Sequence, residues 1–84
     1  MNGERAEQSM LARLRDEVFD ALSKRVEVAA VVEQTHGIVL ITIRLPEGMT
    51  EHRLLATQEW VQLQLIALEG DQSHDGLVFV PRYI

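Results

Sequence analysis

The spacing of the apolar residues changes near residue 25, and this change constrains the fold more than any other feature of the chain. Before it, apolar residues recur at helical spacing and predict a helix at about residues 4–24. The stripe comprises Met10, Leu11, Leu14, Val18, Ala21 and Leu22. After it, every second residue from Val26 to Val32 is apolar, and a β-branched run, IVLITIRL, occupies residues 38–45. A helix followed by a hairpin that turns at residues 34–37 is therefore predicted.

The second half of the chain supports two interpretations. Pro46 and Gly48 end the strand, and Thr50 is placed to cap a second helix. Propensity favours a long helix from Thr50 through Glu69, followed by one last strand. Periodicity favours a short helix that ends near residue 58, because Val61, Leu63, Leu65 and Ala67 would share one face of a strand.

An apparent internal repeat favours the short helix. Residues 72–78 (QSHDGLV) resemble residues 34–39 (QTHGIV) and predict a second hairpin over residues 60–83. Residues 1–84 then form one α+β domain, a two-layer sandwich in which helix-strand-strand occurs twice (αββαββ) and both helices cover one face of a four-stranded, antiparallel-rich sheet. This topology resembles circularly permuted ferredoxin-like domains of assembly and scaffolding proteins, such as the periplasmic domains of secretion and pilus machines. The long-helix alternative resembles the start of a roadblock-type domain.

Composition narrows the classes of function. The net charge is −5, from 8 basic and 13 acidic side chains, and this sign disfavours nucleic-acid binding. The chain has no cysteine, which excludes disulfides and thiolate metal sites. No apolar run approaches the length of a membrane helix, and residues 1–15 are unlike a secretory signal, so a cytoplasmic protein is expected.

Catalytic and metal-binding patterns are absent from the sequence. The serines stand in no nucleophile motif, and the five glycines are scattered singly, so no phosphate-binding loop is expected. His36 and His74 occupy similar turns and are interpreted as solvated turn residues, since two imidazoles are too few for a metal. We expect no enzyme, no metal and no cofactor.

The apolar residues on the second face of the sheet indicate how the chain acts. If the helices cover the face that bears Val39, Ile41 and Ile43, the opposite face keeps an uncovered apolar end. The candidate interface residues there are Ile38, Leu40, Ile66, Leu68, Leu77 and Phe79. They predict a small regulatory protein-protein interaction module (an adaptor, regulator or inhibitor of another protein) that forms a homodimer through this face.

Two alternatives remain open. One is a nucleic-acid-binding domain that uses the bases of the first helix, which are Arg5, Arg13, Arg15, Lys24 and Arg25. The other is a small ligand-binding or enzymatic dimer with its site between the subunits.

Overall fold

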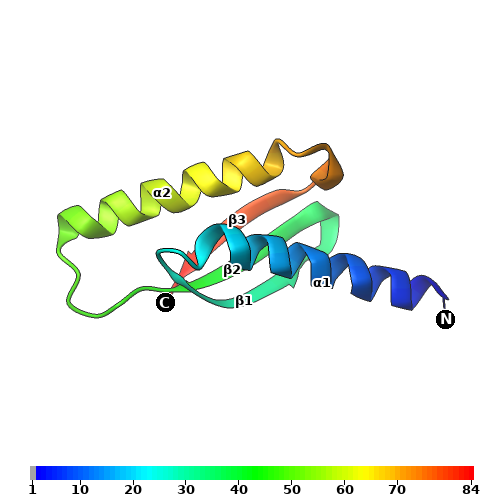
Figure 1. Ribbon diagram of the computed structural model, residues 1–84, viewed down its shortest axis with the longest axis horizontal. Helices are drawn as coiled ribbons and strands as arrows, with labels where there is room; N and C mark the ends of the chain where they lie inside the picture. Colours follow the sequence, from blue (N-terminus) through cyan, green and yellow to red (C-terminus); the bar gives the residue numbers. More distant parts are fainter. Residues whose placement is uncertain (1) are drawn as a thin grey trace.

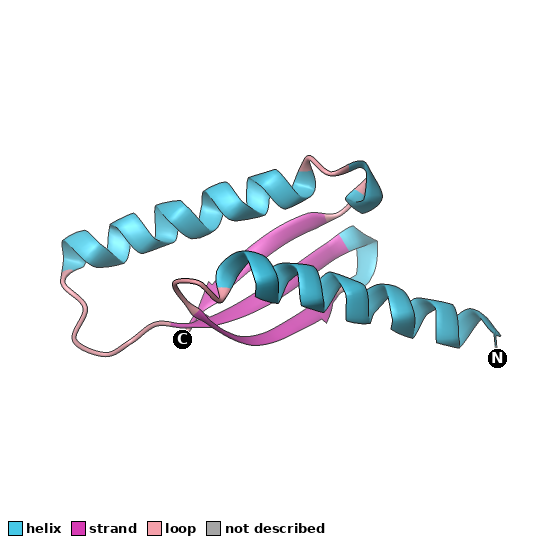
Figure 2. Cartoon of the chain, in the orientation of Figure 1, coloured by secondary structure: helices cyan, strands magenta, loops and turns pink. Residues whose placement is uncertain are grey.

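The computed structural model describes residues 2–84, which form two helices and a three-stranded sheet (Figure 1). The helices and strands are α1 (Asn2–Leu22), β1 (Glu27–Glu33), β2 (Ile38–Arg44), α2 (Glu51–Glu69) and β3 (Val78–Tyr83). Short 3₁₀ turns, η1 (Thr35–Gly37) and η2 (Gln72–His74), precede β2 and β3 (Figure 2). The α+β class is confirmed. The side chains of Arg5 and Met10 lie outside the described part of the chain.

The sheet has the order β1-β2-β3, with β2 in the centre. β1 and β2 pair antiparallel, which confirms the predicted first hairpin, and β3 pairs parallel with β2. Both helices lie on the same side of the sheet, α1 over β1 and α2 over β3 (Figure 1). Within the described residues, no helix or strand covers the opposite side, which we call the open face.

The predicted αββαββ arrangement with four strands is wrong, because α2 continues through the segment expected to form a third strand. The Thr50 hydroxyl accepts a hydrogen bond from the Arg53 amide at 3.3 Å, and the Gly70 amide donates to the Ile66 carbonyl at 3.0 Å. These caps and the helix-forming composition between them outweigh the alternating apolar pattern. Only Val61 and Leu65 of α2 are fully buried. The alternating apolar residues of this segment therefore do not form one buried face, as they would in a strand.

A β-bulge shifts the face that β1 presents to the helices. The register with β2 slips between Val28 and Ala30, so both Val28 and Val31 point into the core. Val32, which simple alternation assigns to the helix-covered face, is instead exposed on the open face. A bulge inserts one extra residue into a strand and thereby reverses the alternation beyond it.

β3 is an edge strand, and this position accommodates Pro81. The Ile84 amide donates to the Ile43 carbonyl at 2.9 Å, so the backbone groups of even-numbered residues face β2. The Pro81 nitrogen therefore points away from the ladder, where its missing N–H costs nothing. Phe79 is buried while Val78 and Val80 are exposed, which reverses the predicted phase of this strand.

One apolar core lies between the covered side of the sheet and the two helices. Its members are Leu14, Val18, Leu22, Val26, Val28, Val31, Val39, Ile41, Ile43, Val61, Leu65 and Phe79. Ile41 and Ile43 of the central strand are completely inaccessible to solvent. The central β2 therefore anchors both layers, as its β-branched composition predicts.

Candidate functional site

The open face carries a contiguous apolar surface at the end of the sheet near η1 and η2. We call it the open-face patch, and it comprises Val32, Ile38, Leu40, Val78 and Val80. Val32, Leu40 and Val80 lie in one row across all three strands, and Ile38 pairs with Val78 in the next row. The exposed fractions are 44% for Val32, 40% for Ile38, 52% for Val78 and 38% for Val80. Such a cluster is typical of an interaction surface, since isolated apolar residues are ordinary but contiguous ones are not.

The other end of the open face is charged. Thr42 pairs with Arg82 of β3, and Arg44 pairs with Glu27 of β1. The alternation that exposes Leu40 also places Thr42 and Arg44 on this face, and Arg82 follows Val80 in the same way. The open face is therefore divided along its length into an apolar half and a half that holds two arginines and one glutamate.

Side chains form hydrogen bonds with some of the backbone groups at the two edges of the sheet. On β1, the Arg15 guanidinium of α1 donates from Nε to the Val31 carbonyl at 3.3 Å. On β3, the Phe79 amide donates to the Glu69 carboxylate at 2.8 Å, and Pro81 has no N–H to offer. Unpaired strand edges invite another strand, and these contacts hinder such pairing. The open face is therefore more accessible to a partner than either edge.

The structure brings together two of the six candidate interface residues. Ile38 and Leu40 lie on the open face, as predicted. Phe79 is only 5% exposed and packs in the core, where it cannot contact a partner. Ile66 and Leu68 belong to α2 and not to a strand, and Leu77 packs beside the core just before β3. The assignment of Ile66 and Leu68 to a sheet face depended on the expected third strand and is wrong, and Leu77 does not lie on the open face because β3 has the opposite phase.

Three members of the open-face patch were missed by sequence reasoning. Val32 was assigned to the covered face because no residue in β1 marks the bulge. The prediction of Leu77 and Phe79 on the open face places the alternating Val78 and Val80 on the covered face, whereas β3 has the opposite phase. All four residues from Leu77 to Val80 are apolar. The sequence therefore gives no signal that could decide which of them face the helices.

A second apolar surface lies on the outer side of α2. Leu55, Leu63 and Ile66 are more than half exposed and lie within a sector of about 80° around the helix. We call these three residues the outer α2 stripe. It faces away from the sheet, so it is separate from the open-face patch.

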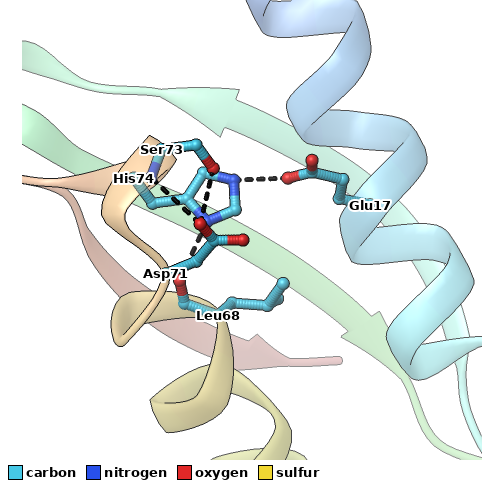
Figure 3. A network of polar contacts seen from close by, with 5 residues as sticks. All are labelled: Glu17, Leu68, Asp71, Ser73 and His74. Carbon is cyan, nitrogen blue, oxygen red and sulfur yellow. Dashed lines mark hydrogen bonds and ion pairs between the residues drawn. The ribbon is translucent and has the colours of Figure 1, made fainter.

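A buried histidine contacts polar groups of both helices (Figure 3). His74 of η2 is 6% exposed, and its Nδ1 lies 2.8 Å from the Leu68 carbonyl. A carbonyl only accepts, so Nδ1 carries the proton and donates. Nε2 contacts the Glu17 carboxylate of α1, and the ring packs edge-to-face on Phe79 with 5.7 Å between centroids. The interpretation of His74 as a solvated turn residue is wrong.

The surroundings of His74 favour its charged form. Burial lowers its pKa, but the contacts with the Leu68 carbonyl and the Glu17 carboxylate outweigh burial and raise the pKa above the usual value. In that form both nitrogens donate, one to each acceptor. Since both nitrogens are engaged, His74 is poorly placed to act as a general base, and it instead ties α1 to the end of α2.

Asp71 shapes the turn that carries His74. Its carboxylate accepts hydrogen bonds from the Ser73 amide at 3.0 Å and from the Ser73 hydroxyl at 2.9 Å (Figure 3). These two bonds, the amide bond first, lower the pKa of Asp71. The Ser73 hydroxyl is thereby committed to a structural contact, which leaves the turn without an activated nucleophile.

The two turns with similar sequences do meet at one end of the sheet. A Cβ atom placed on Gly37 would lie 2.5 Å from the Gly76 carbonyl oxygen, and Gly37 has a φ of +75°. Any side chain at Gly37 is therefore excluded. His36 is exposed and does not join His74, and the described residues contain no group of three His, Asp or Glu side chains arranged for a metal.

A pocket of about 260 Å³ lies between α1 and η2, beside His74. Its apolar lining comes from Leu11, Leu14 and Leu77. Its charged lining is of mixed sign and comprises Arg13, Glu17, Glu33 and Asp75. Every buried polar side chain in the described residues has a hydrogen-bond partner.

Some bases of α1 and of the turn that follows it are already engaged within the chain. Arg15 donates to Val31, and the guanidinium of Arg25 lies 5.2 Å from the centroid of the Trp60 ring. These contacts weaken the case for a nucleic-acid surface on α1. No helix in the described part of the chain is both long and apolar enough to span a bilayer.

Comparison of the chain with protein-family models, with curated proteins and with solved structures finds no match.

Proposed function

We propose that the chain is a non-enzymatic interaction module that forms a homodimer through the open-face patch. The observation that carries this proposal is the row of apolar side chains across all three strands, from Val32 through Leu40 to Val80, on a sheet face that no described element covers. Burying apolar surface contributes about 25 cal/mol per Å², and a second copy offers a matching surface by symmetry.

The size of the face sets the expected affinity. Three strands spaced at about 4.8 Å, each about six residues long, present a face of roughly 14 Å by 20 Å. This is smaller than most interfaces, which bury about 800 Å² of accessible surface per partner. Because association also costs translational and rotational entropy, we expect a dimer with a dissociation constant in the micromolar range.

The outer α2 stripe supports a role as an adaptor or regulator. Leu55, Leu63 and Ile66 lie on the far side of α2 from the sheet, so they stay exposed when two open faces meet. A dimer of this kind presents two such stripes to a further protein. The engaged state of His74 and Ser73 supports the non-enzymatic part of the proposal.

Analytical ultracentrifugation of one double variant tests the proposal. Leu40→Glu with Val80→Glu places two carboxylates in the open-face patch and should give a folded monomer, because neither side chain reaches the core. Phe79 is unsuitable for this test, since it is buried and its replacement would unfold the domain.

The matched control is Leu55→Glu with Leu63→Glu on the outer α2 stripe. It adds the same charge and should leave the dimer intact. A wild-type chain that stays monomeric at several hundred micromolar contradicts the proposal, as does a Leu40→Glu/Val80→Glu variant that remains dimeric.

A further inference from the structure

We infer that the two copies pack face on face about a two-fold axis that runs along β2, so that β1 of each copy lies over β3 of the other. This inference rests on the proposed homodimer and adds its geometry. In a face-to-face dimer the two-fold axis lies between the two sheets and parallel to them. The two limiting choices place the axis along the strands or across them.

In the apolar half of the face, an axis along β2 places apolar side chains of one copy over apolar side chains of the other. Leu40 then faces the partner's Leu40, and Val32 of β1 faces the partner's Val80 of β3, because these residues lie in one row of the sheet. Ile38 lies over the partner's Ile38. Val32, Ile38, Leu40 and Val80 are thus covered by the partner's patch, and Val78, in the row of Ile38, lies just beyond the end of the partner's β1.

An axis across the strands gives a poorer match. If the two faces overlap fully, Ile38 at one end of β2 lies over the partner's Arg44 at the other end. Each guanidinium is then pressed onto apolar side chains and loses water without gaining a carboxylate, which is costly. An offset dimer avoids this contact but covers only part of a face that is already small.

In the charged half, an axis along β2 places Arg44 over the partner's Arg44 at the end of the sheet, and each Arg44 keeps Glu27 of its own chain as its cross-strand neighbour. Arg82 of β3 is two residues beyond Val80, and Ala30 of β1 is two residues before Val32. Arg82 therefore lies over the partner's Ala30, whose small side chain leaves room for it. The partner's Glu27 is next along that strand, within the reach of a long arginine side chain.

Glu27 and Arg82 are separated within one chain. They lie on β1 and β3, on either side of β2, so about 10 Å separates the strands that carry them. Direct contact between the charged groups of Glu27 and Arg82 is therefore expected only between the two copies.

Cross-linking of single-cysteine variants tests the direction of the axis. The natural chain has no cysteine, so it should not cross-link and serves as the control. Ile38→Cys and Arg44→Cys mark the two ends of β2. With the axis along β2, a short bismaleimide should join each variant to its own copy. With the axis across the strands, copies of one variant lie about 20 Å apart, and only a mixture of the two variants cross-links.

A charge exchange tests the pairing between copies. Glu27→Arg and Arg82→Glu should each weaken the dimer about tenfold, and the chain carrying both changes should recover most of that loss. Sedimentation equilibrium measures the three dissociation constants. Additive losses in the double variant would overturn the inferred contact.

The two levels of proposal fail in different ways. A monomeric wild-type chain would overturn both the homodimer and its geometry. A dimer that Leu40→Glu with Val80→Glu disrupts, but in which Arg44→Cys does not cross-link to itself, would overturn only the axis along β2.

Discussion

His74 and Glu17 are in direct contact although 57 positions separate them in the chain. The contact joins η2, which follows α2, to the C-terminal half of α1, and the Leu68 carbonyl holds the other side of the imidazole (Figure 3). One buried ring thus links both helices at the end of the sheet where the turns meet. Because an imidazole can gain or lose its charge in the physiological pH range, the strength of this link depends on the charge of the ring.

We expect the stability of the domain to fall as the pH rises from about 6.5 through the raised pKa of His74. Burial alone would lower the pKa of His74, but the hydrogen bond to Leu68 and the contact with Glu17 outweigh it, so the pKa is raised in the folded state. The folded state then binds the proton more tightly than the unfolded chain, whose histidine pKa is about 6.5. The stabilisation is complete below that value and is lost as the pH rises through the higher pKa of the folded state.

Urea denaturation at pH 6 and at pH 9 measures this effect. Glu17→Gln should reduce the difference between the two pH values, because the carboxylate that favours the charged ring is gone. His36→Gln, which changes an exposed histidine of η1, should leave the difference unchanged. Equal stability of the natural chain at both pH values would argue against a charged His74 in the folded state.

The second prediction concerns Ile41 in the centre of the sheet. Its side chain is fully inaccessible, so Ile41→Asp should unfold the domain, since an unpaired buried carboxylate costs several kcal/mol and total stability is of similar size. Thr42→Asp, one residue away on the open face, should stay folded. Circular dichroism melting curves of the two variants provide the comparison, and a cooperative melt of Ile41→Asp would contradict the assigned core.

The third prediction tests the bulge in β1. Val31 is 3% exposed and Val32 is 44% exposed, although regular alternation would place Val32 with Val28. Val31→Ala should cost about 2 kcal/mol of unfolding free energy, as expected for a buried apolar side chain. Val32→Ala should change the stability of the monomer by less than about 0.5 kcal/mol. Urea titrations at low protein concentration measure both, and the reverse order would place the bulge elsewhere.

The fourth prediction tests the length of α2. Gln62 is exposed near the middle of the helix, so Gln62→Pro should destabilise the domain by about 3 kcal/mol, because proline removes a hydrogen bond and clashes with the preceding turn. Gln62→Ala should be neutral or slightly stabilising. Carbon chemical shifts from Glu51 to Glu69 give a direct readout, and extended shifts over residues 61–68 would contradict the helix.

Local spacing along the sequence is sufficient to determine α1, the β1–β2 hairpin, the two turns and the buried positions of β2. The helical stripe through Leu14 and Val18 and the β-branched run around Ile41 act over a few residues, where backbone sterics and side-chain direction dominate. Thr50 and Gly70 also mark the limits of α2 by their residue types, a capping hydroxyl and a terminal glycine. The repeat between the two turns favours a hairpin instead, and that inference is wrong.

Only the tertiary structure decided the remaining features, since each depends on residues far apart in the chain. α2 tolerates exposed Leu63 and Ile66 because packing through Val61 and Leu65 is enough to hold it on the sheet. The bulge in β1 and the phase of β3 determine which valines form the open-face patch, and both follow from pairing with β2. His74 is buried because folding brings Glu17 and the Leu68 carbonyl to its two nitrogens, a convergence that no local pattern encodes.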